Sequence, residues 1–228
     1  MITSKFKHYP ATPINLDCGN AHAILLNAHD AASSFLEIFG TIRTTRKAVG
    51  MPTDEEQDLL RAMLVFASAG LDSMVKQLVR DVLPLIVECD AGAAEMFKEH
   101  IEHRLGMEEK HSRKFLADVL GDRNPRQRLM EQLLSDLTCE SLQSTDQLLR
   151  VASYFNIPSK RITEDPKSLK AVFVVRNEIG HEMDIDFSQS NRSRRPRAKD
   201  KMVAYTNELF RVAATFLSEA DSKIVGGT

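Results

Sequence analysis

The residues best suited to chemistry lie between Val174 and Glu182, where Arg176 and His181 stand five positions apart with Asn177 between them. Arginine carries a permanent charge on a planar fork that fits phosphate oxygens, and histidine exchanges a proton near neutral pH without environmental tuning. This combination predicts phosphodiester chemistry. Because Asn177 and His181 are four positions apart, we expect them to share a helical face, where the amide can orient the imidazole.

Spacing alone does not single out this pair, since Arg104 and His111 stand at a similar separation. Context separates the two. Arg104 lies in a run of charges, whereas Arg176 follows five apolar residues and precedes a basic segment. In the structural alternative, Arg176 is buried and pairs with a carboxylate such as Asp72. His181 would then cap the helix or form hydrogen bonds within the core.

The basic segment runs from Asn191 to Lys201 and holds six basic residues against one acid, in a chain whose net charge is -2. No aromatic residue interleaves the cations, so the expected partner is an RNA phosphate backbone, read with weak sequence preference. A solvated loop of no particular role is the alternative. The predicted RNA-binding residues are Arg192, Arg194, Arg195, Arg197, Lys199 and Lys201.

Other chemistry is weakly supported. The three cysteines are scattered without a Cys-x-x-Cys pair, which favours reduced cytoplasmic thiols over a disulfide frame or a zinc site.

A stretch rich in histidine and acid invites a metal interpretation, but a second Glu-x-x-His element is missing, and a solvated charged face is the preferred interpretation. We therefore predict no metal, no cofactor and, without an evident signal peptide or membrane span, no membrane contact. The residues of that stretch are Glu99, His100, Glu102, His103, Glu108, Glu109 and His111.

The elements that must position these residues are helices, because the apolar period is helical almost throughout. An all-α bundle is the predicted fold, with an N-terminal helical extension over 1–52 and a helical domain over 53–228 that form one continuous unit. Thr53 is an expected N-cap, with Glu56 three residues on, and the stripe that follows is expected to reach Leu85. The expected helices span 20–47, about 53–85, 91–120, 126–137, 144–155, 167–185 and 198–222.

The penultimate helix places Arg176 on an apolar stripe with Leu169, Val172, Ile179 and Met183. On an ideal helix the side chains of Arg176 and His181 diverge by about 140°. We expect Gly180 to end the helix in a left-handed turn that swings the histidine toward the arginine.

The residues at 171–175 are apolar on every side of this helix. One face packed against the same chain would bury only part of them. This pattern favours a partner chain against the remaining face. A two-fold interface there would bring the Arg176/His181 pairs of two protomers into one composite site.

Three segments resemble the HEPN superfamily, and within it the RiboL-PSP-HEPN group. The stretch from Ser68 to Asp81 looks like that group's long second helix, and Ser141 to Ser144 resembles its short connecting segment. Arg176 to Asp184 is similar to its Arg-x4-6-His motif, which has a polar residue after the arginine.

The resemblance implies a homodimeric helical bundle that acts as a metal-independent endoribonuclease, as a toxin or an antiviral-defence effector with an antitoxin or defence partner. Arg176, Asn177 and His181 then correspond to the motif's arginine, polar residue and histidine. Attack by the RNA 2'-hydroxyl would leave a 2',3'-cyclic phosphate end. HEPN toxins silenced by nucleotidylation carry a tyrosine two residues after the histidine, where this chain has Met183.

Two alternatives stay open. One is a noncatalytic HEPN module that binds RNA or protein. The other is a helical oligomerisation or regulatory domain with no role on RNA.

Overall fold

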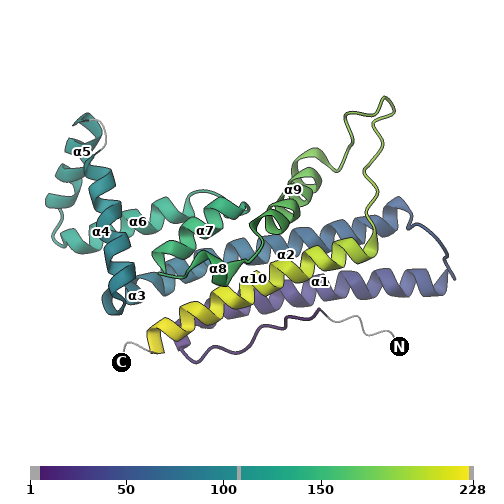
Figure 1. Cartoon of the computed structure of the whole chain (residues 1–228), viewed down its shortest axis with the longest axis horizontal. Coiled ribbons are helices and arrows are strands. Elements are labelled where there is room, and N and C mark those ends of the chain that lie inside the picture. The colour runs from purple at the N-terminus through teal and green to yellow at the C-terminus, as the bar shows by residue number, and fades with distance from the viewer. Residues whose placement is uncertain (1–5, 107–108, 226–228) are drawn as a thin grey trace.

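A computed structural model describes residues 6–106 and 109–225 of the chain (Figure 1). The predicted all-α class is confirmed, since the only β-type pairing among these residues is an isolated antiparallel bridge between Ile185 and Arg194. The helices are η1 (Leu16–Cys18), α1 (Gly19–Thr45), α2 (Asp54–Asp81), α3 (Leu83–Cys89), α4 (Ala91–Leu105), α5 (Glu109–Leu120), α6 (Pro125–Thr138), α7 (Thr145–Tyr154), α8 (Ser159–Ile162), α9 (Pro166–Glu182) and α10 (Lys199–Val225).

Three long helices form the body of the molecule, with α1 and α10 packed lengthwise on α2 (Figure 1). The α1–α2 contact is close. A Cβ placed on Gly70 of α2 would lie 2.2 Å from the Cβ of Ala28, so only glycine fits there. Leu25 and Leu36 of α1 belong to the same hydrophobic core as α2. The residues before 53 therefore supply one of the three long helices of the body.

The start of α2 is fixed as predicted. The Thr53 hydroxyl accepts from the backbone N–H of Glu56, and the Glu56 carboxylate accepts from the backbone N–H of Thr53. This capping box satisfies two backbone donors that a helix start leaves free. Arg43 and Arg46 of the α1 end region also pair with Glu56, at 2.9 and 3.1 Å, which ties the end of α1 to the start of α2.

Helix α2 is long and apolar enough, by length and composition, to cross a membrane. The same composition suits the central helix of a folded body, and α2 does contact α1, α9 and α10 in that position. Its fully buried side chains include Leu60, Leu64, Leu71 and Met74. Its apolarity is therefore explained by packing.

Two predicted boundaries are wrong. The stripe of α2 does not reach Leu85, because α2 ends at Asp81 and Pro84 lies in the first turn of α3, where its missing N–H is harmless. The expected helix over 91–120 is two helices, α4 and α5. They form a lobe with α6 and α7 at one end of the body (Figure 1).

Candidate active site at the end of helix α9

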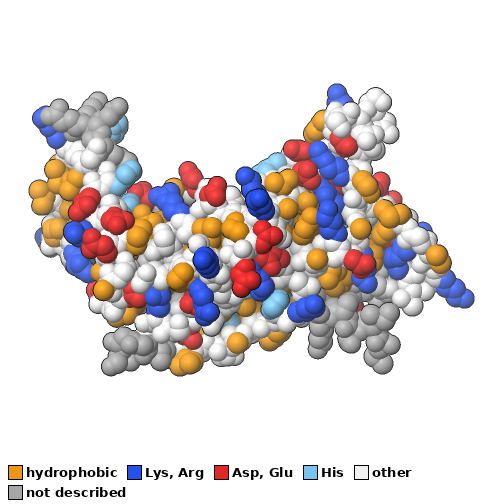
Figure 2. Space-filling view, viewed as in Figure 1, with side chains coloured by type: hydrophobic (Ala, Val, Ile, Leu, Met, Phe, Trp, Pro, Cys, Tyr) orange, Lys and Arg blue, Asp and Glu red, His pale blue; other side chains and the backbone are white. Residues whose placement is uncertain are grey.

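Helix α9 packs on α2 through one face and presents another to solvent, where hydrophobic, basic and acidic side chains lie close together on the surface (Figure 2). Asp165 caps its start by accepting from the backbone N–H groups of Lys167 and Ser168. Val172, Val175 and Ile179 are buried, but Val174 is 48% exposed, so the apolar run is not buried on all sides in the single chain.

An exposed stripe therefore runs along α9. It contains Lys170, Val174, Asn177 and His181, which stand three or four positions apart. Lys170 is a cation on this face that the sequence analysis did not select.

Arg176 and His181 are brought together. The Nη1 of Arg176 lies 3.3 Å from Nε2 of His181 and donates to Oδ1 of Asn177 at 3.1 Å. The guanidinium lies over Gly180, where a Cβ would stand 3.5 Å from both Cζ and Nη1 of Arg176. The length of the arginine side chain thus bridges the angle between the two positions.

The expected role of Gly180 is wrong, although the two motif residues do meet. Helix α9 continues to Glu182, and the left-handed residues are Met183 and Asp184, with φ of 51° and 61°. Gly180 contributes by leaving space above the helix backbone. The amide of Asn177 also differs from expectation, because its described hydrogen bond is to the guanidinium and not to the imidazole.

Two opposing influences act on the pKa of Arg176. Burial lowers the pKa of Arg176, while the negative charge of Asp72 acts in the opposite direction. Asp72 accepts from Lys76 at 3.2 Å and from the backbone N–H of Leu142 at 2.6 Å, and no direct ion pair joins it to Arg176 among the described residues. The buried Nε of Arg176 has no hydrogen-bond partner. The structural alternative of an Arg176–Asp72 ion pair is therefore absent from the described part of the chain.

The hydrogen-bond donors of arginine limit the roles that Arg176 and His181 can take in their contact. A guanidinium has only donors, so a hydrogen bond across the 3.3 Å contact requires the His181 tautomer in which Nε2 is the acceptor. His181 itself is exposed. The end of α9 thus presents a permanent cation beside a nitrogen lone pair at the protein surface.

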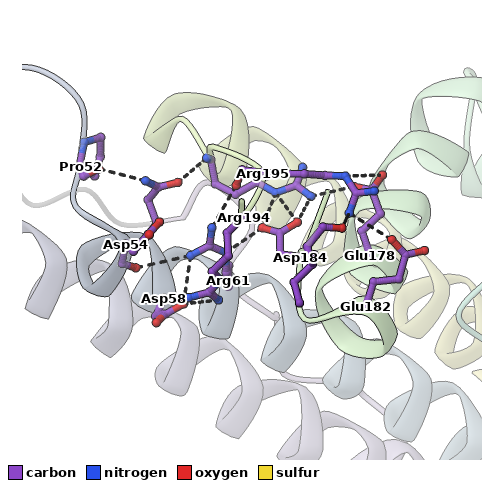
Figure 3. Close-up of polar contacts among 12 residues, drawn as sticks. Pro52, Asp54, Asp58, Arg61, Glu178, Glu182, Asp184, Arg194 and Arg195 are labelled. Carbon is purple, nitrogen blue, oxygen red and sulfur yellow. Dashed lines mark hydrogen bonds and ion pairs between the residues drawn. The ribbon is translucent and has the colours of Figure 1, made fainter. Parts of the chain in front are cut away.

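The basic segment after α9 is arranged differently from the expectation of a free cationic loop. Arg194 pairs with Asp58 at 2.6 Å, and Arg195 pairs with Glu182 at 3.1 Å (Figure 3). Arg197 pairs with Glu178 at 2.7 Å. Three of the six predicted RNA-binding cations are therefore largely neutralised inside the molecule.

A buried carboxylate, Asp184, organises these arginines (Figure 3). Asp184 is fully buried and accepts from Nε of Arg61 at 2.7 Å and from Nε of Arg197 at 2.9 Å. Arg61 also donates to the backbone oxygen of Arg195 at 3.0 Å, which joins α2 to the segment before α10. We name Arg61, Glu178, Asp184, Arg195 and Arg197 the Asp184 clasp.

The pKa of Arg197 reflects the clasp. Burial acts to lower it, but hydrogen bonds to Asp184 and Glu178 outweigh burial, and the pKa is raised. The guanidinium is therefore held in its charged form by acceptors of opposite charge.

The other predicted RNA-binding residues remain available. Arg192 is exposed, and its side chain has no ion pair within residues 6–106 and 109–225. The Nζ atoms of Lys199 and Lys201 lie 6.0 and 5.6 Å from the ring centres of Phe39 and Tyr205. These long contacts leave the charges near solvent.

The histidine-rich stretch forms no metal cage among the described residues, where no three histidine, cysteine or acidic side chains converge. Glu108 lies outside the described residues, and the side chain of Glu109 is likewise not described. In the competing pair, Arg104 contacts Asp136 at 3.8 Å and lies 5.5 Å from the ring centre of Phe115.

Comparisons with known proteins give no family for this chain. No family model matches it, and no curated protein or solved structure matches it. What the fold and the site define is an all-α protein with an Arg–Asn–His group at the end of a surface helix, in which Asn177 and His181 are exposed and Arg176 is half-buried.

Proposed function

We propose that this protein is a metal-independent endoribonuclease of the HEPN type. The proposal is carried by one observation, the 3.3 Å contact between Nη1 of Arg176 and Nε2 of His181 at an exposed helix end. A phosphate-binding cation and a proton acceptor lie within the reach of one phosphodiester. Biologically, such an enzyme would act in the cytoplasm as a toxin or defence effector.

In the proposed reaction, the RNA 2'-oxygen attacks the adjacent phosphorus while the bond from phosphorus to the 5'-oxygen breaks. The products are a 2',3'-cyclic phosphate and a 5'-hydroxyl. Nε2 of His181 accepts the 2' proton, a role typically worth about 10² to 10⁴ in rate. Arg176 stabilises the charge that develops on the nonbridging oxygens.

The contact between the two side chains prepares this step. An incoming phosphate competes with His181 for the donors of Arg176, because a charged acceptor forms the stronger hydrogen bond. Moving the guanidinium onto the phosphate frees the lone pair of Nε2. Asn177, which accepts from Nη1 at 3.1 Å, limits how far the guanidinium travels.

A homodimer would complete the site by supplying a second histidine to protonate the leaving 5'-oxygen. The exposed apolar side chains beside the motif support this arrangement, since Val174 is 48% and Met183 is 66% exposed. A two-fold contact over these residues would bring the two motifs face to face.

Chelator-resistant cleavage is the direct test. The purified chain is incubated with RNA in excess EDTA, and we expect products that end in 2',3'-cyclic phosphate. His181→Ala and Arg176→Ala should each lower the rate by about 100-fold or more, given the magnitude of proton-transfer catalysis and charge stabilisation. Substrate with 2'-deoxyribose should survive because it lacks the nucleophile.

The competing Arg–His pair supplies a matched control. His111→Ala removes an exposed histidine at the decoy position and should retain full activity. Activity that disappears on chelation, or that falls equally in His111→Ala and His181→Ala, would refute the proposal.

A noncatalytic module is the second candidate, and the ion pairs of the basic segment favour it. Arg194, Arg195 and Arg197 are paired with acids, which reduces the positive field next to the motif. This candidate predicts that RNA or a protein partner is bound but not cut. Equal binding by wild type, Arg176→Ala and His181→Ala, with intact RNA recovered from each, would favour it over the nuclease.

A further inference from the structure

A pocket with charged side chains in its lining lies among α4, α6 and α7, apart from the α9 motif. Its volume is about 540 Å³. The residues that carry the argument are His100, His103 and Arg104 from α4, Asp136 from α6, and Arg150 and Tyr154 from α7. The nuclease proposal uses none of them.

His100 is the informative residue of this pocket. Its side chain is only 6% exposed, and its buried Nε2 has no hydrogen-bond partner among the residues that the structure describes. Oδ2 of Asp136 lies 3.5 Å away, which is the limit for such a bond, and the geometry does not form one. Tyr154 packs edge-on against the imidazole, with ring centres 6.2 Å apart. A buried polar atom without a partner costs about 1 to 3 kcal/mol, so a ligand atom at this position would be stabilising.

Two guanidinium groups and two carboxylates line the pocket around His100, namely Arg104 and Arg150 with Glu99 and Asp136. Arg104 contacts Asp136 at 3.8 Å, whereas Arg150 has no ion pair within the described part of the chain. Burial lowers the pKa of His100, Asp136 raises it, and the charges of Arg104 and Arg150 lower it further. The imidazole is thus neutral near pH 7, and its Nε2 can carry a proton to donate.

A metal ion is the rival ligand, because His100 and His103 on α4 stand opposite Asp136 and Cys139 at the end of α6. Two observations oppose it. No three such side chains converge among the described residues, and the thiol of Cys139 lies 3.4 Å from the backbone oxygen of Asp136. Arg104 and Arg150 would also repel a divalent cation.

We propose that this pocket binds a small phosphate-bearing anion. Arg150 and Arg104 contact its oxygens, and Nε2–H of His100 donates to another oxygen from the pocket wall. Guanidinium groups fit phosphate oxygens in this way. The volume also admits a mononucleotide, since ligand pockets commonly measure about 300 to 1,000 Å³. Asp136 and Glu99, which also lines the pocket, oppose the anion, and the contact of Asp136 with Arg104 offsets part of that repulsion.

Calorimetric titration of the full chain at constant ionic strength tests the proposal, with inorganic phosphate and 5'-AMP as separate probes. We expect saturable binding of phosphate. Arg150→Gln should raise Kd at least about tenfold, which corresponds to about 1.4 kcal/mol for one charged contact. Arg150 is exposed, so this variant should fold. Arg123→Gln, an exposed arginine in the loop before α6, is the matched control and should bind as wild type does.

The two probes separate the sources of the phosphate group. Tighter binding of 5'-AMP than of phosphate identifies a nucleotide pocket, whereas equal affinity identifies recognition of the phosphate alone. Absence of saturable binding to both probes overturns the proposal, as does equal weakening in Arg150→Gln and Arg123→Gln. Zinc binding that depends on His100 and Cys139 and excludes phosphate would also overturn it. None of these outcomes depends on RNA cleavage.

Discussion

Two groups of charges lie at the same end of α9 and differ in how completely they are satisfied. Arg176 and His181 are joined by one 3.3 Å contact, and the buried Nε of Arg176 has no hydrogen-bond partner within residues 6–106 and 109–225. A few residues later, the fully buried Asp184 accepts from Arg61 and Arg197. Both groups contain arginine in sequence surroundings rich in charge.

Structural and binding arginines can be separated by the partners of their guanidinium groups. A guanidinium whose donors are occupied by buried carboxylates holds the chain together and has little left for a ligand. The Arg176 guanidinium lies beside an exposed imidazole and has no carboxylate partner among the described residues, so its Nη2 remains for an incoming anion, whereas its Nε is buried. Composition alone makes the arginines of both groups candidates for RNA binding. Their hydrogen-bond partners favour only Arg176 over the arginines of the clasp.

The strongest test of this comparison is Asp184→Asn. The substitution preserves shape but removes the negative charge between Arg61, which is 3% exposed, and Arg197, which is 12% exposed. Breaking a buried ion pair from one side costs about 3 to 5 kcal/mol, because the remaining charge is left uncompensated. Denaturant unfolding followed by circular dichroism should record a loss of this size.

His181→Ala is the matched variant from the exposed group. Its unfolding free energy should stay within about 0.5 kcal/mol of wild type, as for most surface substitutions. If His181→Ala were as destabilising as Asp184→Asn, the exposed pair would be a structural element and the contrast would be lost.

Substitutions at Gly180 distinguish the space available to the Arg176 side chain from the stability of helix α9. A Cβ at this position meets Arg176 at 3.5 Å, an ordinary van der Waals distance, so Gly180→Ala should leave the Arg176–His181 contact in place. It should also raise stability by up to about 1 kcal/mol, because glycine disfavours helix interiors. Gly180→Leu shares the helical preference but fills the space of the guanidinium, and it should reduce RNA cleavage markedly.

Cleavage rates and unfolding free energies measured on both variants decide the point. Equal activity in the alanine and leucine variants would mean that the position of Arg176 over the helix backbone is unimportant.

The sequence predicted the fold class and the motif because both depend on local patterns. Apolar spacing identified the long helices, and Thr53 with Glu56 marked a helix start through a contact three residues apart. Arg176 and His181 lie on one helix, so their proximity depends on one side chain's length and on the glycine between them.

The Asp184 clasp could not be predicted in this way. Arg61 and Asp184 are 123 positions apart, and only the packing of α9 on α2 brings them together. A run of arginines looks the same in the sequence whether it faces solvent or folds onto carboxylates. Glu178 and Glu182, which flank the motif histidine, were the available signal that nearby cations had local partners.

The smallest expected effects lie within the basic segment itself, where Arg192 and Arg194 are two positions apart. Arg194 pairs with Asp58, which is 51% exposed, so Arg194→Gln should cost no more than about 1 kcal/mol of stability. Arg192→Gln should leave stability unchanged, because its side chain has no ion pair among the described residues. RNA retention should respond in the opposite order.

Loss of a free cation that contacts phosphate weakens binding across sequences and reduces the salt slope by about 1, whereas loss of a neutralised cation should not. Filter binding over a salt series, run on Arg192→Gln and Arg194→Gln, measures this difference. A larger loss of RNA in Arg194→Gln would show that the ion pair with Asp58 opens when RNA binds. The Arg194–Asp58 ion pair and the RNA-binding surface would then be two states of one segment, and hydrogen-bond saturation in the free chain would no longer separate structural from binding arginines.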